Sequence, residues 1–277
     1  MTADQEFADR YGPWAVIVGA SNGVGEAYAR LVAELGINVV LLARRQNLLD
    51  EVAGAIIADF GVETRVLSVD LTSSTAADDI LGVTADLDVG TLMYCAGAES
   101  EVRAFFSISL DHARGLVHRN CVVPLELCHH FGPRMAERRS GAIVLVSSAA
   151  GLHGMANMVT YAGTKAFDIV FAEALWAELH GRGVDVLCPV LGATDTPAYR
   201  EVLAEAGVLS GPEDTAPIPG AVSSEETAAE IIANLGNGPV WPVSQVLRDR
   251  LDQLGRLDRN EAARVLLSAV SSTPDEP

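Results

Sequence analysis

The sequence passes from a buried strand into a helix through a glycine-rich turn near its start. The apolar run Trp14–Val18 predicts the strand, and helical spacing follows from Gly25 to Leu35. The turn between them consists of Gly19, Ala20, Ser21, Asn22, Gly23, Val24 and Gly25. Glycine permits positive φ and close backbone approach, and a helix N-terminus presents free N–H groups to phosphate. This order of elements predicts a dinucleotide pyrophosphate site, with Gly19 and Ser21 through Gly25 as cofactor contacts.

Further along, short apolar runs alternate with helical patterns. Strands are expected at residues 37–43, 64–69, 91–95, 142–147 and 184–188. Helices are expected at residues 48–59, 76–81, 110–135, 160–180 and 223–235. Because connections between parallel strands cross over the sheet, this repetition predicts an α/β fold of the Rossmann-like, doubly wound type. Its parallel sheet carries helices on both faces.

We interpret residues 1–277 as a single domain, since α/β domains of about 250 residues are common. Residues 10–197 are expected to form the dinucleotide-binding and catalytic core. Residues 198–222 are expected to be an irregular substrate lid, because Gly and Pro are frequent there. Residues 223–277 predict a C-terminal extension of helix and strand with a frayed tail after about Ser268. Ser224, followed by two glutamates, is expected to cap the first helix of this extension.

Composition limits the partners of this chain. It has 37 acidic and 19 basic residues and a net charge of −18, which disfavours nucleic acid. No signal peptide is evident, and the apolar runs are far shorter than the ~20 residues that span a membrane. Four scattered cysteines without a Cys-x-x-Cys pair predict reduced thiols. The histidines lack partners at metal-ligand spacing, so no metal is expected. These features predict a cytoplasmic protein with no membrane partner.

The second expected strand ends in Ala43-Arg44-Arg45. An NAD site usually has an acidic residue at this point to hold the ribose 2′-hydroxyl, and Ala43 cannot accept a hydrogen bond. Guanidinium groups bind phosphate through charge-assisted bidentate bonds. Arg44 and Arg45 therefore favour NADP(H) over NAD(H); the alternative interpretation is a solvated strand end.

A possible proton-transfer group follows the fifth expected strand. Ser148 closes that strand, and Tyr161 and Lys165 lie four residues apart on the helix after it, which places them on one face. A free phenol has a pKa near ~10. A neighbouring ammonium favours the phenolate, so the tyrosine can exchange a proton with an alcohol or carbonyl near neutral pH. The serine hydroxyl can hydrogen-bond the substrate oxygen.

With these motifs, the segment from Gly12 to Pro197 resembles the short-chain dehydrogenase/reductase family. The resemblance implies that Tyr161 is the acid/base, that Lys165 lowers its pKa and holds the nicotinamide ribose, and that Ser148 orients the reacting oxygen. It implies that Asn120 supports a water-linked proton relay to Lys165. It also implies cofactor contacts by Tyr161 and Lys165, and by a further set: Asp70 (adenine), Leu71, Ala96, Gly97, Gly192, Thr194 and Thr196 (nicotinamide amide).

Two segments depart from the usual family pattern. The chain has Tyr94-Cys95-Ala96-Gly97 where the family usually has Asn-Asn-Ala-Gly, and Leu191-Gly192 where it has Pro-Gly. These departures, with the arginine pair, resemble a subgroup containing bacterial 7β-hydroxysteroid dehydrogenases. A bulky, steroid-like substrate is therefore a hypothesis, to which six apolar residues contribute: Leu152, Met155, Met158, Leu203, Val208 and Leu209.

These observations predict an NADPH-dependent oxidoreductase that interconverts a secondary alcohol and a ketone of small-molecule size. The alternatives are a β-ketoacyl reductase acting on carrier-bound substrates and a non-catalytic, nucleotide-binding regulatory protein. A sugar-nucleotide epimerase or dehydratase would need a longer region after Thr196. The resemblance also implies a homodimer or homotetramer, formed through the helix around Asn120 and the helix that carries Tyr161.

Overall fold

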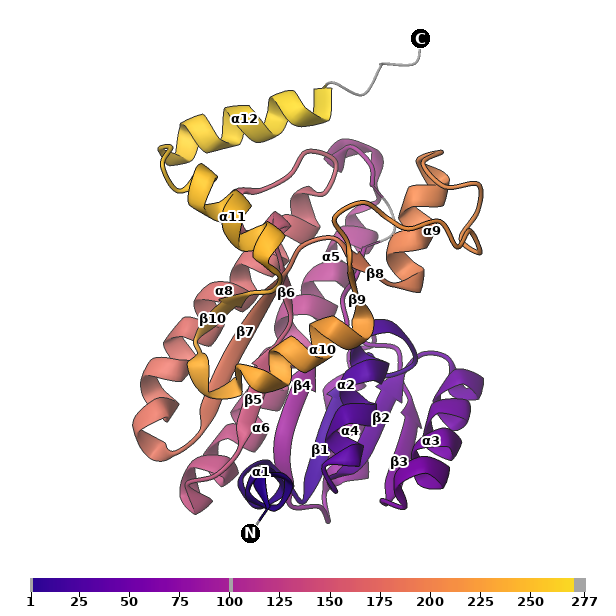
Figure 1. Cartoon of the computed structure of the whole chain (residues 1–277), viewed down its shortest axis with the longest axis vertical. Helices are drawn as coiled ribbons and strands as arrows, with labels where there is room; N and C mark the ends of the chain where they lie inside the picture. Colours follow the sequence, from indigo (N-terminus) through magenta and orange to yellow (C-terminus); the bar gives the residue numbers. More distant parts are fainter. Residues whose placement is uncertain (1, 100–101, 272–277) are drawn as a thin grey trace.

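The computed structural model describes residues 2–99 and 102–271 (Figure 1). Its main sheet has eight strands. They are β1 (Trp14–Val18), β2 (Asn38–Ala43), β3 (Thr64–Ser68), β4 (Val89–Tyr94), β5 (Ala142–Leu145), β6 (Ser147–Ser148), β7 (Asp185–Leu191) and β10 (Val240–Pro242). The order is β10-β7-β5-β4-β1-β2-β3, with β6 paired to β7, and every pairing is parallel. A separate two-stranded sheet joins β8 (Thr194–Asp195) to β9 (Val222–Ser223).

Helices cover both faces of the main sheet. They are α1 (Ala3–Tyr11), α2 (Gly23–Glu34), α3 (Gln46–Phe60), α4 (Ala76–Thr84), α5 (Leu110–Val117), α6 (Val123–Arg138), α7 (Ala150–His153), α8 (Val159–Leu179), α9 (Pro197–Glu205), α10 (Ser224–Ala233), α11 (Gln245–Leu254) and α12 (Arg259–Ser271). Short turns of other helix types occur at Phe105–Ser107, His118–Val122, His180–Arg182 and Leu235–Asn237. The α/β class predicted from the alternating pattern is confirmed.

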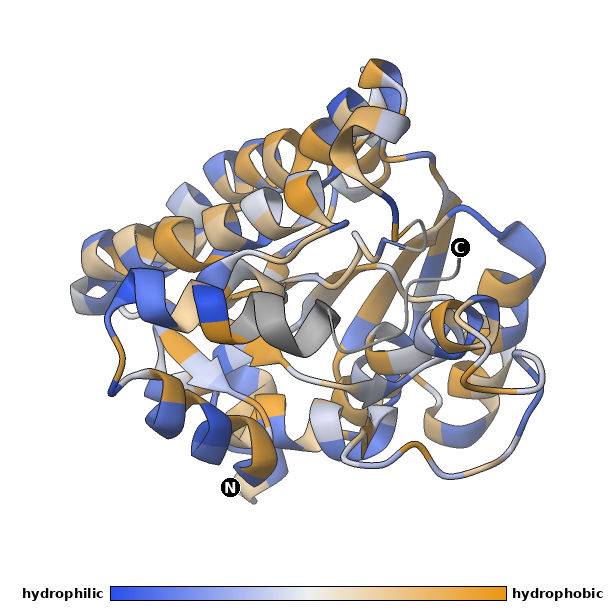
Figure 2. Ribbon diagram, turned by 90° about the horizontal axis from the view of Figure 1, so that it is seen from above, coloured by the Kyte–Doolittle hydropathy of each residue, from blue (hydrophilic) through white to orange (hydrophobic). Residues whose placement is uncertain are grey.

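Each sheet face has its own hydrophobic core. Side chains of α4, α6 and α8 pack on one face, and side chains of α2, α3 and α10 pack on the other. Strands enclosed on both sides need apolar residues at every position, which explains the fully buried run of β1. In Figure 2 hydrophobic and hydrophilic residues alternate along the flanking helices, as expected for helices with one buried face.

The first and last described helices lie at opposite ends of the molecule (Figure 1). Figure 1 shows α1 at one end and α11 and α12 at the other, above α5 and α8. Tyr11 ties α1 to the sheet, because its hydroxyl donates to Asp185 at 2.7 Å and Arg10 pairs with the same carboxylate at 2.6 Å. The C-terminal segment also belongs to the main fold, since β10 forms the edge strand beside β7.

Three local expectations were wrong. The helix expected over 110–135 is interrupted by a π-helical turn, His118–Val122, between α5 and α6. The region expected to be irregular contains α9, capped by Thr196. The cap of α10 is Ser223, which forms a capping box with Glu226, and not Ser224. The chain is helical from Ser268 to Ser271, and the rest of the tail predicted to fray lies outside the described residues.

Candidate active site

Helix α8 places Tyr161 and Lys165 on successive turns of one face. Tyr161 is half-buried, whereas Lys165 is only 5% exposed. Two contacts fix the backbone at Lys165. The hydroxyl of Ser147 donates to the Lys165 carbonyl at 2.7 Å, and Gly151 of α7 lies so close that a Cβ there would stand 2.6 Å from the carbonyl carbon of Lys165. The position of the lysine is therefore set by close backbone packing.

The ammonium of Lys165 has two hydrogen-bond acceptors in a buried environment. It donates to the carbonyl of Val146 at 2.8 Å and to Oδ2 of Asp168 at 3.0 Å, and its Nζ lies 6.0 Å from the ring centroid of Tyr161. Burial lowers the pKa of Lys165, but the neighbouring acidic groups, chiefly the Asp168 carboxylate and then Tyr161, together outweigh it, so the pKa lies above its ordinary value. Burial also raises the pKa of Asp168, and the ammonium opposes this effect. Lys165 is thus charged at neutral pH.

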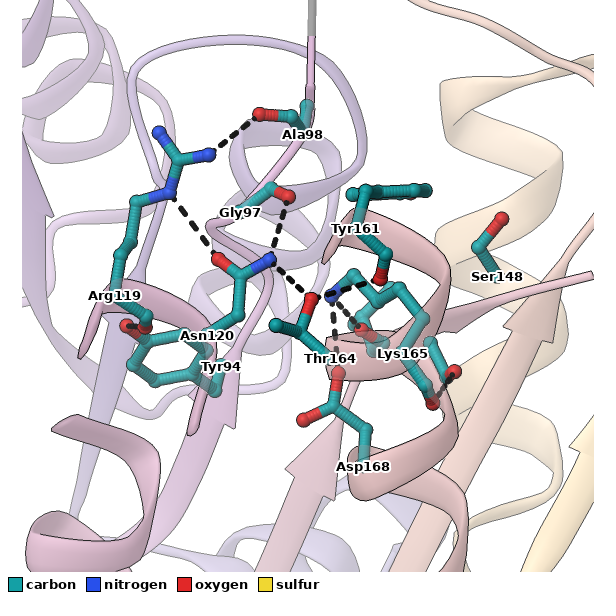
Figure 3. Close-up of polar contacts among 12 residues, drawn as sticks. Tyr94, Gly97, Ala98, Arg119, Asn120, Ser148, Tyr161, Thr164, Lys165 and Asp168 are labelled. Atoms are coloured by element: carbon teal, nitrogen blue, oxygen red, sulfur yellow. Dashed lines mark hydrogen bonds and ion pairs between the residues drawn. The ribbon is translucent and has the colours of Figure 1, made fainter. Parts of the chain in front are cut away.

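Asn120 lies in the π-helical turn, with 1% of its surface exposed. Its side-chain N–H groups donate to Oγ1 of Thr164 at 2.9 Å and to the Gly97 carbonyl at 3.3 Å. Its Oδ1 accepts from Nε of Arg119 at 3.2 Å. Thr164 in turn donates to the carbonyl of Tyr161 at 2.8 Å. Asn120 therefore connects the end of β4 to the turn of α8 that carries the tyrosine (Figure 3).

Tyr94, which stands where the family usually has asparagine, supports the π-helical turn next to Asn120. Its hydroxyl donates to the main-chain carbonyl of Arg119. Burial raises the pKa of Tyr94 well above its ordinary value, so the phenol remains a neutral donor. Arg119 also donates through Nη2 to the Ala98 carbonyl at 2.9 Å, and its burial lowers its pKa. Sequence reasoning missed Arg119, Thr164 and Asp168, although each lies next to, or one turn from, a predicted residue.

Ser148 follows β5 and is half-buried. Figure 3 shows Tyr161 and Lys165 between Asn120 on one side and Ser148 on the other. The Ser148 hydroxyl accepts from the Ala150 N–H at 3.3 Å, so one of its lone pairs is used locally. A small pocket adjoins the tyrosine and is lined by Glu99, Arg103, Phe105, Ile108, Leu116, Asn157, Met158, Val159, Thr160 and Tyr161. Of the six apolar residues expected to shape a substrate site, Met158 lines this pocket.

The glycine turn leaves the N-terminus of α2 open. Gly19 has φ of +96°, and a Cβ there would stand 2.8 Å from the Ala96 nitrogen, so the turn and the end of β4 are in direct contact. A Cβ on Gly25 would lie 2.2 Å from the Gly19 carbonyl oxygen. Asn22 makes no side-chain cap, which leaves the first N–H groups of α2 available to an anion. A side chain at Gly19 or Gly25 would collide with neighbouring backbone, so only glycine fits at these two positions of the turn.

The remaining predicted cofactor residues surround this turn or follow neighbouring strands. Val24 is buried beneath the turn, and the methyl of Thr196 would lie 3.2 Å from a Cβ on Gly23, although the Thr196 hydroxyl also caps α9. Thr194 donates to the Gly192 carbonyl at 3.4 Å.

Asp70, for which an adenine contact is expected, is exposed and precedes the buried Leu71. Backbone and side-chain hydrogen bonds from Thr72 hold the pKa of Asp70 below its ordinary value.

Arg44 and Arg45 are exposed at the carboxyl end of β2. Nη2 of Arg45 lies 3.3 Å from the hydroxyl of Ser21, so this guanidinium faces the glycine turn. Within the described part of the chain neither arginine forms an ion pair. The residues fit a nicotinamide dinucleotide, because free N–H groups for its pyrophosphate lie at the N-terminus of α2 and the Arg45 guanidinium faces the same turn.

The same described residues contain no cluster of three or more His, Cys, Asp or Glu side chains that could hold a metal. They also include no helix that is long and apolar enough to cross a membrane. All four cysteines are free thiols.

Comparisons with known proteins agree with this geometry. Residues 13–207 match the family model for short chain dehydrogenases. A 7β-hydroxysteroid dehydrogenase of Collinsella aerofaciens is 33% identical over 228 residues, which cover 82% of this chain and 84% of the relative. A structure from a study of 7β-hydroxysteroid dehydrogenase stereoselectivity has a TM-score of 0.85 and 30% identity, covering 94% of this chain and 98% of that one. A Sphingobium yanoikuyae short-chain dehydrogenase in complex with NADPH has a TM-score of 0.73 and 25% identity, covering 95% and 98%.

Fold, site and family model therefore define an oxidoreductase with a nicotinamide cofactor. The chain belongs to the short-chain dehydrogenase/reductase family. Within that family it is similar to the 7β-hydroxysteroid dehydrogenases over most of its length. The resemblance inferred from the glycine turn, Tyr161 and Lys165 is confirmed.

Proposed function

We propose that this protein interconverts a secondary alcohol and a ketone with NADP(H), and that its substrate is bulky and hydroxysteroid-like. The observation that carries the proposal is the placement of Tyr161 at a pocket, one helical turn from the buried ammonium of Lys165. A phenol in that position can exchange a proton with a substrate oxygen.

In the direction of reduction, bound NADPH supplies the hydride that reaches the carbonyl carbon. Tyr161 gives its hydroxyl proton to the carbonyl oxygen, so the product is the neutral alcohol. Lys165 stabilises the phenolate that remains, because its positive charge lies 6.0 Å from the centroid of the Tyr161 ring in a buried site. Ser148 orients the substrate oxygen through its hydroxyl. Asn120, fixed by Thr164 and Gly97, supports the proton supply through ordered water near Lys165.

The arginines at the end of β2 support NADPH as the preferred cofactor. A 2′-phosphate carries about two negative charges, and this acidic chain offers Arg44 and Arg45 beside the turn where that phosphate would lie. The NADPH complex of the Sphingobium relative is in keeping with this preference.

The lining of the small pocket beside Tyr161 supports an apolar substrate with a polar end, whereas the bulk of the proposed substrate rests on the similarity to hydroxysteroid dehydrogenases. Phe105, Ile108, Leu116, Met158 and Val159 give most of its lining an apolar character. Two charged residues, Glu99 and Arg103, belong to the same lining. Apolar walls with few polar groups are typical of sites that fix the orientation of a rigid ligand. The similarity to 7β-hydroxysteroid dehydrogenases suggests a steroid of that type.

The test is a screen of reduced-nicotinamide absorbance. NADPH and NADH are each mixed with the protein and with a 7-keto steroid carboxylate, a ketone carrying two bulky groups, or a 3-oxoacyl thioester. We expect oxidation of NADPH, fastest with the steroid, and slow oxidation of NADH. Turnover of the thioester alone would favour a β-ketoacyl reductase. NADPH binding without turnover of any ketone or alcohol would favour a non-catalytic nucleotide-binding protein.

The proposal includes a homodimer or homotetramer in the cytoplasm. Large apolar residues are exposed on three neighbouring helices of the site: Leu110 and Val117 on α5, Leu125 on α6 and Val170 on α8. Surfaces of this kind are typical of subunit contacts. Light scattering after size exclusion is expected to give two or four times the mass of the chain; a monomer would contradict this part.

A further inference from the structure

Lys165 is the only lysine in the sequence, since the other 18 of the 19 basic side chains are arginines. Every permanently charged basic side chain other than Lys165 is therefore an arginine. The ammonium is a compact point charge with three donors, whereas a guanidinium is a planar group with five. A compact charge in a dry site needs a partner, because burial disfavours the ionised amine.

Asp168 provides that partner. It lies three residues after Lys165 on the same face of α8, and its side chain is 4% exposed while that of the lysine is 6% exposed. Its Oδ2 accepts from Nζ at 3.0 Å. The Val146 carbonyl accepts a second N–H, so one N–H of the ammonium remains for the side of the site that contains Tyr161.

Besides Tyr161, the thiols and the Tyr94 phenol around this pair are uncharged at neutral pH. Cys95 after β4 and Cys121 in the π-helical turn face Lys165, and burial raises the pKa of each thiol to about 11. Burial raises the pKa of Cys188 on β7 further. Cys128 on α6 and Tyr94 on β4 face Asp168, and burial raises their pKa values as well. Asp168 thus supplies the principal counter-charge for Lys165.

We propose that Asp168 is a positioning residue that keeps the Lys165 ammonium charged and directs its remaining N–H toward Tyr161 and the cofactor ribose. The role in proton transfer rests on the proposed function, whereas the effect on Lys165 does not. The ion pair fixes the orientation of the ammonium, because the Asp168 carboxylate and the Val146 carbonyl each accept one of its N–H groups.

A single lysine makes a direct test possible without any substrate. Protein labelled with ¹⁵N at the lysine side chain gives one side-chain signal, which reports the protonation of Lys165. We expect the wild-type signal to remain that of an ammonium up to about pH 10. In Asp168→Asn we expect the signal to titrate at clearly lower pH, because the burial effect is then no longer balanced. A wild-type lysine that loses its proton below about pH 9 would overturn the proposal, whether or not the variant folds.

Kinetics test the consequence for catalysis. Asp168→Asn is expected to lower kcat about tenfold or more and to move the alkaline limb of the pH profile to lower pH by about one unit. Asp168→Glu, which keeps the charge, is expected to restore the position of that limb. The matched control is Glu173→Gln, which also replaces a carboxylate by an amide but at an exposed site on α8. It should leave the pH profile of kcat unchanged. If Asp168→Asn lowered kcat by the same factor at every pH, Asp168 would have a packing role only, and the proposal would be overturned.

The two readouts separate the two claims. If no ketone or alcohol is turned over but the lysine signal of Asp168→Asn still titrates early, the proposed function fails and the assignment of Asp168 to Lys165 stands. If turnover is normal and both the signal and the pH profile are insensitive to Asp168→Asn, the proposed function stands and this inference fails.

Discussion

Asn120 and Thr164 join two parts of the site through one hydrogen bond of 2.9 Å, in which the asparagine N–H donates to the threonine hydroxyl. The Thr164 hydroxyl in turn donates to the carbonyl of Tyr161 at 2.8 Å, so the position of Asn120 is coupled to the backbone of the tyrosine. Both residues are almost fully buried. The π-helical turn brings Asn120 to this position, which is in keeping with the frequent occurrence of such turns at functional sites.

Thr164→Val should weaken this connection without changing volume greatly. The variant leaves a buried amide with one acceptor fewer, at a cost of about 1–3 kcal/mol in unfolding free energy. We expect kcat to fall severalfold, because Asn120 and the first turn of α8 are less well fixed. Urea unfolding and steady-state kinetics measure the two effects. Thr164→Ser retains the hydroxyl and serves as the control; equal losses in both variants would contradict the role of the hydrogen bond.

Gly151→Ala tests the close approach of α7 to α8. The added Cβ would stand 2.6 Å from the backbone of Lys165, which cannot move aside as a flexible side chain can. We expect a loss of about 1–3 kcal/mol in stability together with reduced kcat. Gly54→Ala on α3 is the control, since a Cβ there meets nothing within 4 Å and should stabilise the helix by about 0.5–1 kcal/mol. A harmless Gly151→Ala would refute the packing argument.

Arg44→Ala tests cofactor choice. Loss of one charge-assisted contact to a 2′-phosphate is expected to raise the Kd for NADPH about tenfold or more. The Kd for NADH, which lacks that phosphate, should change little. Fluorescence titration with each nucleotide gives both constants. Equal weakening of NADH and NADPH would place Arg44 away from the 2′-phosphate, and Arg45 could then be examined in the same way.

Tyr94→Phe tests the residue that stands where the family usually has asparagine. The variant removes the donor to the Arg119 carbonyl and keeps the ring that packs in the core. We expect a loss of about 1–2 kcal/mol in unfolding free energy and a smaller loss in kcat, because Arg119 also orients Asn120. Thermal or urea unfolding measures the first effect. Unchanged stability would show that the carbonyl finds another donor.

The sequence was most informative where a local pattern has a local cause. The fully apolar run of β1, the glycine turn and the spacing of Tyr161 and Lys165 each predict their structure, because both sheet faces are covered and because residues four apart share a helix face. The ends of helices were harder to predict, as the N-cap of α10 illustrates. Ser223 and Ser224 are both residue types that cap helices, but only Ser223 is three residues before Glu226, the spacing that forms a capping box.

Features that depend on distant contacts could not be predicted in this way. The π-helical turn around Asn120 has no distinctive spacing in the sequence. Helix α1 was not expected, and it is held by Asp185, which is remote in the chain. The pairing of Asp168 with Lys165 has the spacing of an ordinary exposed ion pair, and it becomes informative only because both side chains are buried. The absence of any second lysine was the one available signal for it.

Tyr161→Phe tests the central claim most directly, because it removes only the hydroxyl that is proposed to exchange the proton. The measurement combines NADPH binding by fluorescence with turnover of the ketone that the wild type reduces. We predict a fall in kcat of about 10²–10⁴-fold or more with an NADPH Kd close to that of the wild type. Turnover at the wild-type rate in Tyr161→Phe would contradict the account.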